Sequence, residues 1–349
     1  MTFRYTFIGA ASSSSKSMTP QSSPGIKVKR DIGEQFRKAL AGQGALDRRR
    51  KIASDEAYVY LPVRPELVEE KQLRNISDYE QVVREFVHEP VILTPEGILG
   101  YQPSFEVIGD IAVVEQDDVE TVASALMSSC KNLRSVITPI SDVEGEFRTR
   151  RFRHVTGEER TNTIHKEHCI RYRVDLEGAY FTPRLGTERL RVARQVRPGD
   201  FVLDMFAGVG PFALLLARRG VRVVAIDKNP VAVKCLRENA LLNKIDVEIL
   251  EGDASDLALN YEDVADHVIM NLPHTAHQFL GPAIRAAKNG GVVHYYAISE
   301  EKDRYCDLGL IEAATAHQGA KAEVLYKGTV RSYAPHRYNV VIDFCVSKE

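Results

Sequence analysis

The sequence is poor in features that mark secreted, membrane or disulfide-stapled proteins. Its five cysteines are scattered, and none forms a C-x-x-C pair: they are Cys130, Cys169, Cys235, Cys306 and Cys345. An odd number of dispersed thiols is typical of a reducing compartment and argues against a disulfide scaffold. No run approaches the roughly 18 apolar residues of a membrane span, and the N-terminus has no sustained apolar core of the secretory type. We therefore expect a cytoplasmic protein without a membrane anchor.

Metal-ligand spacing is also missing. The segment HKEHC (165–169) holds two histidines and a cysteine, but this spacing fits no standard zinc pattern. His274 and His277 lie one helical turn apart and have no third ligand nearby in the sequence. The sequence therefore predicts no metal site, and it places these two histidines at the surface or beside a substrate.

A large excess of charge of one sign is absent as well. The formal net charge is −2, which is not typical of a general polyanion binder. The charge is uneven, however: residues 145–197 contain 13 Lys and Arg against 7 Asp and Glu, a net +6, which leaves −8 elsewhere. Such a window fits a bounded nucleic-acid footprint, although by charge alone a solvated, Arg-rich surface is the more common explanation.

Changes in composition divide the chain into four segments. Residues 1–24 are Ser-rich and are expected to form a disordered tail, although this basic, acid-free stretch also fits a transit peptide. Residues 25–72 alternate strand, helix, basic turn and strand, which predicts a small N-terminal domain. Residues 76–175 contain the hairpin FEVIGDIAVVEQ and an amphipathic helix, which predict an α+β middle domain. Residues 176–349 form a third domain.

In this third domain, apolar runs that end in small or acidic residues alternate with helical segments. The runs are FVLDMFAG, VRVVAID, DVEILEGD, DHVIMNL and GVVHYYAI. Such alternation predicts an α/β fold in which helices cover both faces of a parallel sheet. The C-terminal segment from Glu323 supplies two last strands, which we expect to close the sheet edge as a hairpin.

The motif LDMFAGVGPF (203–212) follows the first of these strands. Its two glycines, Gly208 and Gly210, would let the backbone pass close to a ligand. Asp204 opens the turn, and Asp227 ends the next strand 23 residues later, where a carboxylate can bind ribose hydroxyls. No third glycine follows at the G-x-x-G spacing of a pyrophosphate-binding turn.

Two further residues belong to this motif set. Asp253, after the third strand, is placed to accept from an adenine amino group, whereas Phe206 either packs on the cofactor or fills the core. Together these features predict the S-adenosylmethionine site of a class I, Rossmann-like methyltransferase.

The fourth strand ends in Asn271-Leu272-Pro273-His274. This tetrad departs from the Asn-Pro-Pro-aromatic motif of enzymes that methylate amino groups, and it favours a ring nitrogen. A ring nitrogen that bears a proton needs a general base, and the charge that develops on the neighbouring carbonyl oxygen needs a cation. Arginine-rich segments at 144–154 and 180–196 provide candidates. In the second of these, Glu188 is a lone acid, a pattern that more often marks an ion pair.

At this point the residues resemble a family. The segments EGEFRTRRFRHVTGEERTNTIHKE, YFTPRLGTERLR, DMFAGVGPF, AIDKNP, VIMNLP, GGVVHYY and RSYAP are similar to those of the archaeal and eukaryal tRNA (guanine-N1)-methyltransferases. These enzymes modify the guanosine 3′ of the anticodon, at tRNA position 37. The resemblance covers residues 25–349, and it implies a class I methyltransferase domain preceded by two smaller α+β RNA-binding domains.

The resemblance also implies residue roles. Glu188 matches the general base for the N1 proton, and Arg148 matches the arginine that stabilises charge on guanine O6. The residues that match positions around the target nucleotide are Asn271, Pro273, Tyr180 and Arg184. The residues that match the cofactor site are Asp204, Phe206, Gly208, Gly210, Asp227, Asp253 and Asn271.

The expected partners are S-adenosylmethionine, with S-adenosylhomocysteine as product, and tRNA. The basic window would follow the anticodon stem-loop. The N-terminal domain would test the outer corner of the tRNA, with candidates Arg48, Arg49, Arg50 and Lys51, a run that fits an ordinary exposed turn equally well. We expect a monomer. Three alternatives stay open: a wyosine-pathway aminocarboxypropyl transferase, an additional carbon methylation of the tricyclic intermediate, and a non-catalytic tRNA-binding protein.

Overall fold

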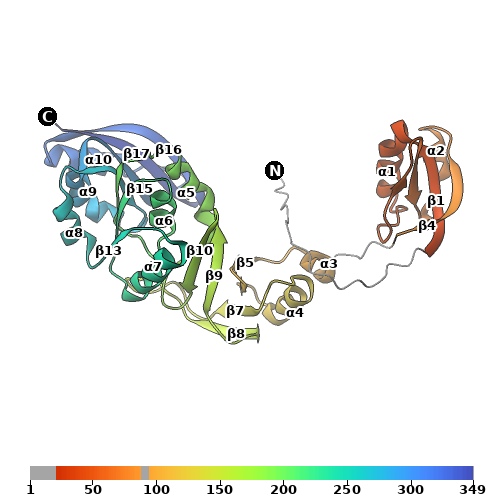
Figure 1. The fold of residues 1–349 in the computed structure, drawn as a ribbon, viewed down its shortest axis with the longest axis horizontal. Coiled ribbons are helices and arrows are strands. Elements are labelled where there is room, and N and C mark those ends of the chain that lie inside the picture. Colours follow the sequence, from red (N-terminus) through yellow and green to blue (C-terminus); the bar gives the residue numbers. More distant parts are fainter. Residues whose placement is uncertain (1–20, 88–93, 349) are drawn as a thin grey trace. The chain divides into compact units, whose positions relative to one another are not determined.

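The computed structural model describes residues 21–87 and 94–348, and the chain divides into two compact units, residues 1–93 and 94–349. Figure 1 labels their helices and strands. In the described part of the chain, no helix is both long enough and apolar enough to cross a bilayer. The Ser-rich stretch of residues 1–20 lies outside the described residues.

The first unit is a four-stranded antiparallel sheet covered by helix α1. Its strands are β1 (Gln21–Lys29), β2 (Ala53–Ser54), β3 (Tyr58–Pro62) and β4 (Glu80–Phe86), in the order β2-β3-β1-β4. Its helices are η1 (Arg30–Ile32), α1 (Gly33–Gly42), η2 (Pro65–Leu67) and α2 (Glu70–Arg74). Phe36 and Leu40 lie one turn apart on α1 and are fully buried against Ile26 and Leu61, so α1 is the helix expected in this domain and it is amphipathic.

The boundaries of this unit differ from those expected. β1 begins at Gln21, so residues 21–24 belong to a strand and not to the tail. β4 pairs with β1 along its whole length, whereas the sequence assigned residues 80–86 to the middle domain. The physical reason is that β4 is an edge strand that is mostly solvated, with only Phe86 buried. Its charged face hides the strand pattern.

The second unit begins with a mixed four-stranded sheet and a hairpin. The elements are α3 (Pro95–Leu99), β5 (Phe105–Ile108), β6 (Ile111–Val114), α4 (Val119–Ser129), β7 (Ser135–Pro139), β8 (Phe152–Gly157), β9 (Asn162–Glu167) and β10 (Ile170–Asp175). The expected hairpin is present, because β5 pairs antiparallel with β6 around a Gly-Asp turn. This region is not a separate body: Ile108 and Tyr172 pack in the same apolar cluster as Phe212 and Leu236 of the C-terminal part.

The rest of the second unit is built on a seven-stranded sheet. Its strands are β11 (Phe201–Asp204), β12 (Arg222–Asp227), β13 (Glu248–Glu251), β14 (Ala265–Met270), β15 (Ala287–Glu300), β16 (Ala320–Ala334) and β17 (Arg337–Lys348). Their order is β13-β12-β11-β14-β15-β17-β16. β11 to β15 run parallel, and β17 is antiparallel to both of its neighbours. The parallel sheet and the hairpin that closes its edge are therefore confirmed.

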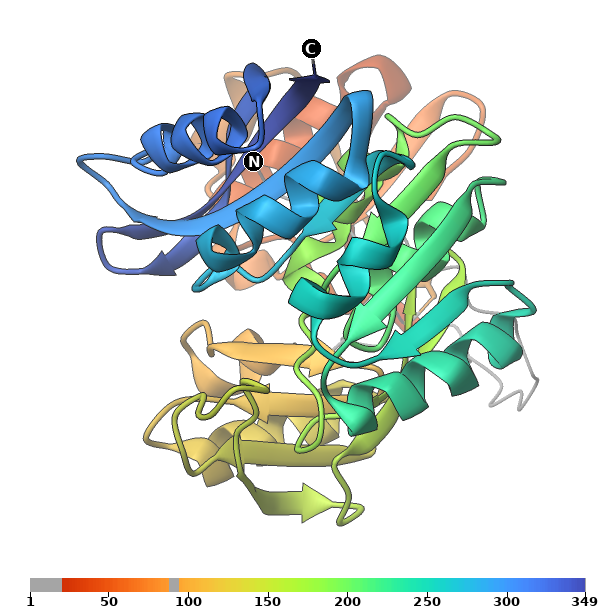
Figure 2. The same ribbon diagram turned by 90° about the vertical axis from the view of Figure 1, so that its left-hand side faces the viewer.

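Helices cover both faces of this sheet (Figure 2). On one face lie α5 (Gly186–Ala193), α6 (Pro211–Ala217) and α7 (Pro230–Asn243), and η3 (Pro183–Leu185) directly precedes α5. On the other lie α8 (Ala254–Leu257), η4 (Ala258–Tyr261), η5 (Ala276–Phe279), α9 (Leu280–Ala286) and α10 (Leu308–His317), the last of which the sequence analysis did not anticipate. From β11, the chain builds the sheet first toward β13 and then, from β14 on, in the opposite direction. In open α/β sheets, ligands bind at the carboxyl ends of the strands where the direction of strand order reverses in this way.

Candidate active site

Two acidic residues end the neighbouring strands β11 and β12. Asp204 is fully buried, and burial raises the pKa of its carboxyl to about 7. Asp227 accepts hydrogen bonds from two backbone amides: its Oδ2 lies 2.6 Å from the nitrogen of Gly208, and its Oδ1 lies 2.8 Å from that of Asn229. Burial also raises the pKa of Asp227, although these amide bonds oppose the shift. The backbone of the first two strand-to-helix turns therefore holds the Asp227 carboxylate in one orientation.

The two glycines of the first turn have different roles. Both have positive φ, 56° at Gly208 and 92° at Gly210, a region that favours glycine. A β-carbon on Gly210 would lie 2.2 Å from Cδ1 of Leu236, so this glycine lets helix α6 pack against α7. A β-carbon on Gly208 would have only the carbonyl oxygen of Tyr180 nearby, at 3.9 Å. Gly208 therefore leaves open space where a ligand can approach the backbone.

Asp253, after β13, is tied to a distant loop. Its Oδ1 accepts from the backbone nitrogen of Ser255 at 2.9 Å and from the Ser255 hydroxyl at 2.6 Å, and these bonds lower the pKa of Asp253. Its Oδ2 lies 3.3 Å from the ammonium of Lys228, which also contacts Glu146 at 2.6 Å. Glu146 precedes Arg148 in the arginine-rich loop. Lys228 therefore links the end of the sheet to the loop that carries Arg148.

A cleft opens at this edge of the sheet. The residues selected from the sequence that line it are Arg148, Tyr180, Phe206, Gly208, Asp227, Asp253, Asn271 and Pro273. Phe206 both lines the cleft and packs edge-to-face on Phe279, with ring centroids 4.9 Å apart. Asp204 and Gly210 are buried in the same turn without lining the cleft.

Two residues that line the cleft, Asn271 and Asn339, each carry an unpaired acceptor. The side-chain oxygens of Asn271 and Asn339 are both buried and accept no hydrogen bond from the described residues. Buried polar atoms in native proteins are nearly always paired. A ligand with at least one hydrogen-bond donor is therefore the natural partner of this part of the cleft.

Cations and aromatic rings line the same cleft. Arg148 adopts a positive φ of 55°, and its guanidinium carbon lies 5.8 Å from the ring centroid of Tyr180. Arg331, on β16, donates to the Tyr180 hydroxyl at 3.3 Å. The His274 ring packs edge-on against Tyr333, and burial together with the charges of Arg148 and Arg337 lowers the pKa of His274 to about 4. His274 is therefore neutral at physiological pH and leaves the positive charge to the arginines.

The sequence reasoning assigned no role to three of these lining residues, Arg331, Tyr333 and Asn339. The first two lie in RSYAP, a segment that supported the family resemblance. The sequence predicted the hairpin of β16 and β17, and the missing information was its register against β15, which decides which of its side chains reach the cleft.

Glu188 does not line the cleft. It lies on α5 between Leu185 and Arg189, which do line it, and its own exposed fraction is 9%. Its carboxylate accepts from Arg191 and from the buried hydroxyl of Tyr296, the latter at 2.7 Å. The ion pair that a lone acid among arginines predicts is therefore present, with Arg191 as its partner.

Arg184 also lies outside the main cleft. It lines an adjoining hollow and forms an ion pair with Glu106 at 3.1 Å. Glu106 also accepts from the Thr182 hydroxyl at 2.9 Å. The structure therefore does not bring Arg184 together with Asn271 and Pro273.

The basic window is partly balanced by acids from outside it. Within residues 21–87 and 94–348, seven of its cations form ion pairs: Arg150, Arg153, Arg160, Arg173, Arg184, Arg189 and Arg191. Acids outside the window that take part are Asp110, Glu115, Glu120, Glu106, Glu238 and Asp343. The positive surface is therefore smaller than the sequence count indicates.

One buried ion pair supports the wall of the cleft. Arg189 contacts Glu167 with two nitrogens, at 2.8 and 2.5 Å, and also donates to the carbonyl of Thr182 at 3.2 Å. We expect Glu167→Ala to destabilise the second unit by about 3–5 kcal/mol, because it leaves a buried guanidinium without its carboxylate. Urea unfolding followed by circular dichroism measures the change.

The matched control is Glu120→Ala, which removes the acid of the exposed pair with Arg153. Its unfolding midpoint should stay within experimental error of the parent, since exposed ion pairs contribute little. Equal midpoints for both variants would contradict a structural role for Glu167.

Comparison with known proteins agrees with this architecture. A family model described as the TRM5/TYW2 methyltransferase domain matches residues 163–321, and one described as the tRNA methyltransferase 5 N-terminal domain matches residues 25–71. The tRNA (guanine(37)-N(1))-methyltransferase Trm5b of Pyrococcus abyssi is 40% identical over 92% of this chain and 98% of its own length.

Two further relatives bear on the chemistry. A solved structure titled as the complex of aTrm5 and tRNALeu is 34% identical, has a TM-score of 0.70 and covers 92% of this chain and 99% of the other. A tRNA(Phe) (4-demethylwyosine(37)-C(7)) aminocarboxypropyltransferase of Methanocaldococcus jannaschii is 32% identical but matches only 68% of this chain, and 96% of its own length. The resemblance noted in the sequence is confirmed: this chain belongs to the family of tRNA (guanine(37)-N(1))-methyltransferases.

Proposed function

We propose that this protein transfers the methyl group of S-adenosylmethionine to N1 of the guanosine at tRNA position 37. The observation that carries the proposal is the pair of unpaired amide oxygens, of Asn271 and Asn339, in a cleft that also holds Asp227 and Gly208. A guanine offers ring and amino N–H donors to such oxygens. The neighbouring arginines suit the guanine carbonyl and a phosphate group.

The cofactor side of the cleft fits a nucleoside with a short charged tail. The Asp227 carboxylate can accept from two ribose hydroxyls, and the open backbone at Gly208 admits close approach. Asp253 and the wall near Phe206 suit the adenine. When bound, S-adenosylmethionine supplies an electrophilic methyl group and leaves as S-adenosylhomocysteine.

On the acceptor side, the N1 proton must leave as the methyl group arrives. In our proposal Glu188 takes this proton, so that a carboxylate becomes a carboxylic acid and N1 exchanges its N–H bond for an N–CH₃ bond. Arg148 donates to guanine O6, where negative charge develops. Glu188 lies one layer behind the cleft lining, and the flanking Leu185 and Arg189 lie in that lining. The target base therefore has to be turned out of its stack and inserted deeply.

The tRNA partner would cover a wider surface. Arg48, Arg50 and Lys51 line a shallow hollow on the first unit, a surface suited to phosphates of the outer corner of the tRNA. We propose that the protein acts as a monomer in the cytoplasm, where its five cysteines, none of which forms a disulfide, would stay reduced.

The direct test is product analysis. The protein is incubated with methyl-labelled S-adenosylmethionine and unmodified tRNA transcripts that carry guanosine or adenosine at position 37. Formation of N1-methylguanosine on the guanosine transcript alone is the expected result. Label transferred only when the aminocarboxypropyl portion carries it would assign the protein to the wyosine branch, and no transfer of either kind would leave a tRNA-binding role.

Arg331 provides a prediction about substrate contact. Its Nε is buried and donates to no acceptor among the described residues, and its side chain lines the cleft beside Tyr180. We expect Arg331→Ala to weaken tRNA binding by roughly tenfold, because a charge-assisted hydrogen bond is lost. Filter binding with the unmodified transcript measures the Kd.

Arg304→Ala is the matched control, since Arg304 lies over Tyr338 and does not line the cleft. It removes the same charge from the same sheet region. If both variants weaken tRNA binding equally, Arg331 contributes only through the long-range electrostatic attraction of the tRNA and not through a direct contact.

A further inference from the structure

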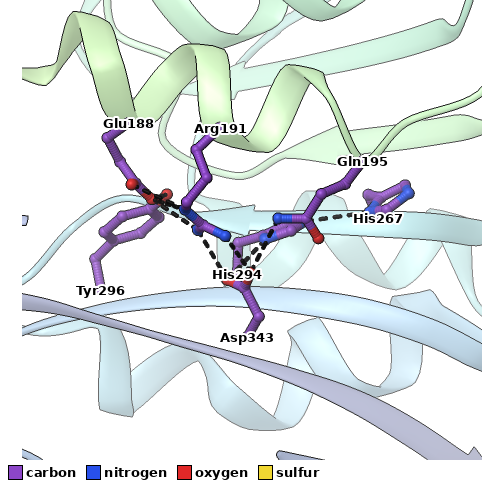
Figure 3. A network of polar contacts seen from close by, with 7 residues as sticks. All are labelled: Glu188, Arg191, Gln195, His267, His294, Tyr296 and Asp343. Atoms are coloured by element: carbon purple, nitrogen blue, oxygen red, sulfur yellow. Dashed lines mark hydrogen bonds and ion pairs between the residues drawn. The ribbon is translucent and has the colours of Figure 1, made fainter. Parts of the chain in front are cut away.

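Behind Glu188 lies a polar network that the sequence did not indicate. Most of its members are buried, whereas Arg191 is half-buried and Gln195 is exposed. Figure 3 shows its seven members: Glu188, Arg191, Gln195, His267, His294, Tyr296 and Asp343. They come from α5, from the turn after it, which carries Gln195, and from β14, β15 and β17. His294 and Asp343 are direct cross-strand partners in the β15–β17 pair. The face of the sheet under α5 is therefore polar at this point, although it is apolar around it.

Arg191 is shared between two carboxylates. Its Nε and one terminal nitrogen contact Glu188 at 2.9 and 2.7 Å, and its other terminal nitrogen contacts Asp343 at 2.6 Å. Asp343 is 1% exposed, so its charge has no access to solvent. A guanidinium that faces two carboxylates cannot neutralise both.

Further donors converge on Asp343. The Nδ1 of His294 lies 2.8 Å from Oδ1, and the side-chain amide of Gln195 donates to Oδ2 at 3.1 Å. Burial alone would raise the pKa of Asp343, but the bonds from His294 and Arg191 outweigh it and hold the pKa well below its usual range. An ionised Asp343 only accepts, so Nδ1 of His294 carries a proton. The Nε2 of His294 in turn lies 3.1 Å from Nδ1 of His267, whose ring is nearly parallel to it.

The two carboxylate oxygens of Glu188 accept unequal numbers of hydrogen bonds. Oε1 accepts from Tyr296 at 2.7 Å and from two nitrogens of Arg191 at 2.7 and 3.1 Å. Among the described residues, Oε2 accepts only from Nε of Arg191, at 2.9 Å. The network therefore holds the carboxylate mainly through Oε1 and leaves Oε2 able to accept a further hydrogen bond.

We propose that Asp343, backed by His294, is a positioning residue for methyl transfer: it draws Arg191 to one side so that Glu188 is held by Oε1 while Oε2 stays able to take a proton. The inference rests on the proposed role of Glu188 as the base. Without the charge of Asp343, Arg191 pairs with Glu188 alone. Both carboxylate oxygens are then open to the same guanidinium, and the orientation of the carboxylate is no longer fixed from two sides.

The test is a double-mutant cycle on the full chain. The variants are Asp343→Asn, Glu188→Gln and the combination, and the readout is the single-turnover rate with a guanosine-37 transcript. We expect Asp343→Asn to lower this rate by roughly 10- to 100-fold, the range of coupling within one hydrogen-bond network, with unchanged Kd for tRNA and S-adenosylmethionine. In the Glu188→Gln background the same change should have no further effect.

The outcomes distinguish the positioning role of Asp343 from the role of Glu188 as the base. A similar loss from Asp343→Asn in both backgrounds, or no loss in the parent, overturns the positioning role while leaving Glu188 as the base. A parental rate for Glu188→Gln itself overturns the base assignment and the inference with it.

Two further variants guard against a folding defect in Asp343→Asn. His294→Asn keeps a donor near the position of Nδ1 and should retain most of the rate, whereas His294→Leu removes it and should lower the rate. Equal rates for these two would contradict the role of His294. Asp307→Asn is the matched control and should leave the rate unchanged. Asp307 accepts a hydrogen bond from Tyr295. Tyr295 is the chain neighbour of Tyr296 but packs in the apolar cluster on the opposite face of the sheet.

Discussion

Glu188→Gln is expected to slow methyl transfer by roughly 10²- to 10⁴-fold, the contribution of a general base. The amide has nearly the same shape but cannot accept the N1 proton. Glu188 does not line the cleft, so the Kd values of tRNA and S-adenosylmethionine should stay close to those of the parent. Rapid-quench single-turnover kinetics with saturating enzyme measure the chemical step directly.

The chain offers a close control for this change. Glu301 also contacts an arginine three residues away, Arg304, and a tyrosine hydroxyl, that of Tyr338 at 3.2 Å, but it is exposed. Glu301→Gln should leave the rate unaltered. If Glu188→Gln transfers methyl groups at the rate of the parent protein, the pair of Glu188 with Arg191 is only structural. Another residue must then act as the base.

Arg148→Ala is expected to reduce the same single-turnover rate by roughly 10²- to 10³-fold, the usual effect of removing a donor from developing negative charge. Three features support a fixed position for this guanidinium: the positive φ of Arg148, its contact with the Tyr180 ring, and the Lys228 bridge from Glu146 to Asp253. Arg148→Lys should recover part of the rate, since it restores charge without the planar pair of donors.

The comparison residue is Arg151, which lies three positions along the same loop and is exposed. Arg151→Ala removes an equal charge and should affect tRNA binding at most. If Arg148→Ala changes only the Kd for tRNA and not the chemical step, then Arg148 is a phosphate contact.

The contrast between Asp227 and Glu188 explains which site residues were predictable. Asp227 ends a parallel strand, and sheet topology alone brings that position to the ligand-binding edge, so its place in the cleft follows from the sequence pattern. Glu188 is on a helix among four arginines, and the sequence did not say which of them pairs with it. The choice of Arg191 depends on Asp343, 152 residues away.

In the first unit, too, elements with a local sequence pattern were predictable and elements that depend on distant segments were not. Helix α1 was recognisable because Phe36 and Leu40 repeat at helical spacing and a glycine ends the helix. Strand β4 was not, because an edge strand keeps its polar face in water and gains its hydrogen bonds from β1, a distant segment.

By itself, the sequence determined the class I α/β fold, the glycine turn from Asp204 to Gly210, the Asn271–Pro273 end of β14 and the membership in a tRNA methyltransferase family. These depend on local signals: strand–helix periodicity, glycines at positive φ and acids at strand ends. Only the tertiary structure decided that β16 and β17 bring Arg331 and Asn339 to the cleft and that Arg191 bridges Glu188 and Asp343. Such contacts join distant segments through the pairing of strands, and no local pattern records which side chains meet there.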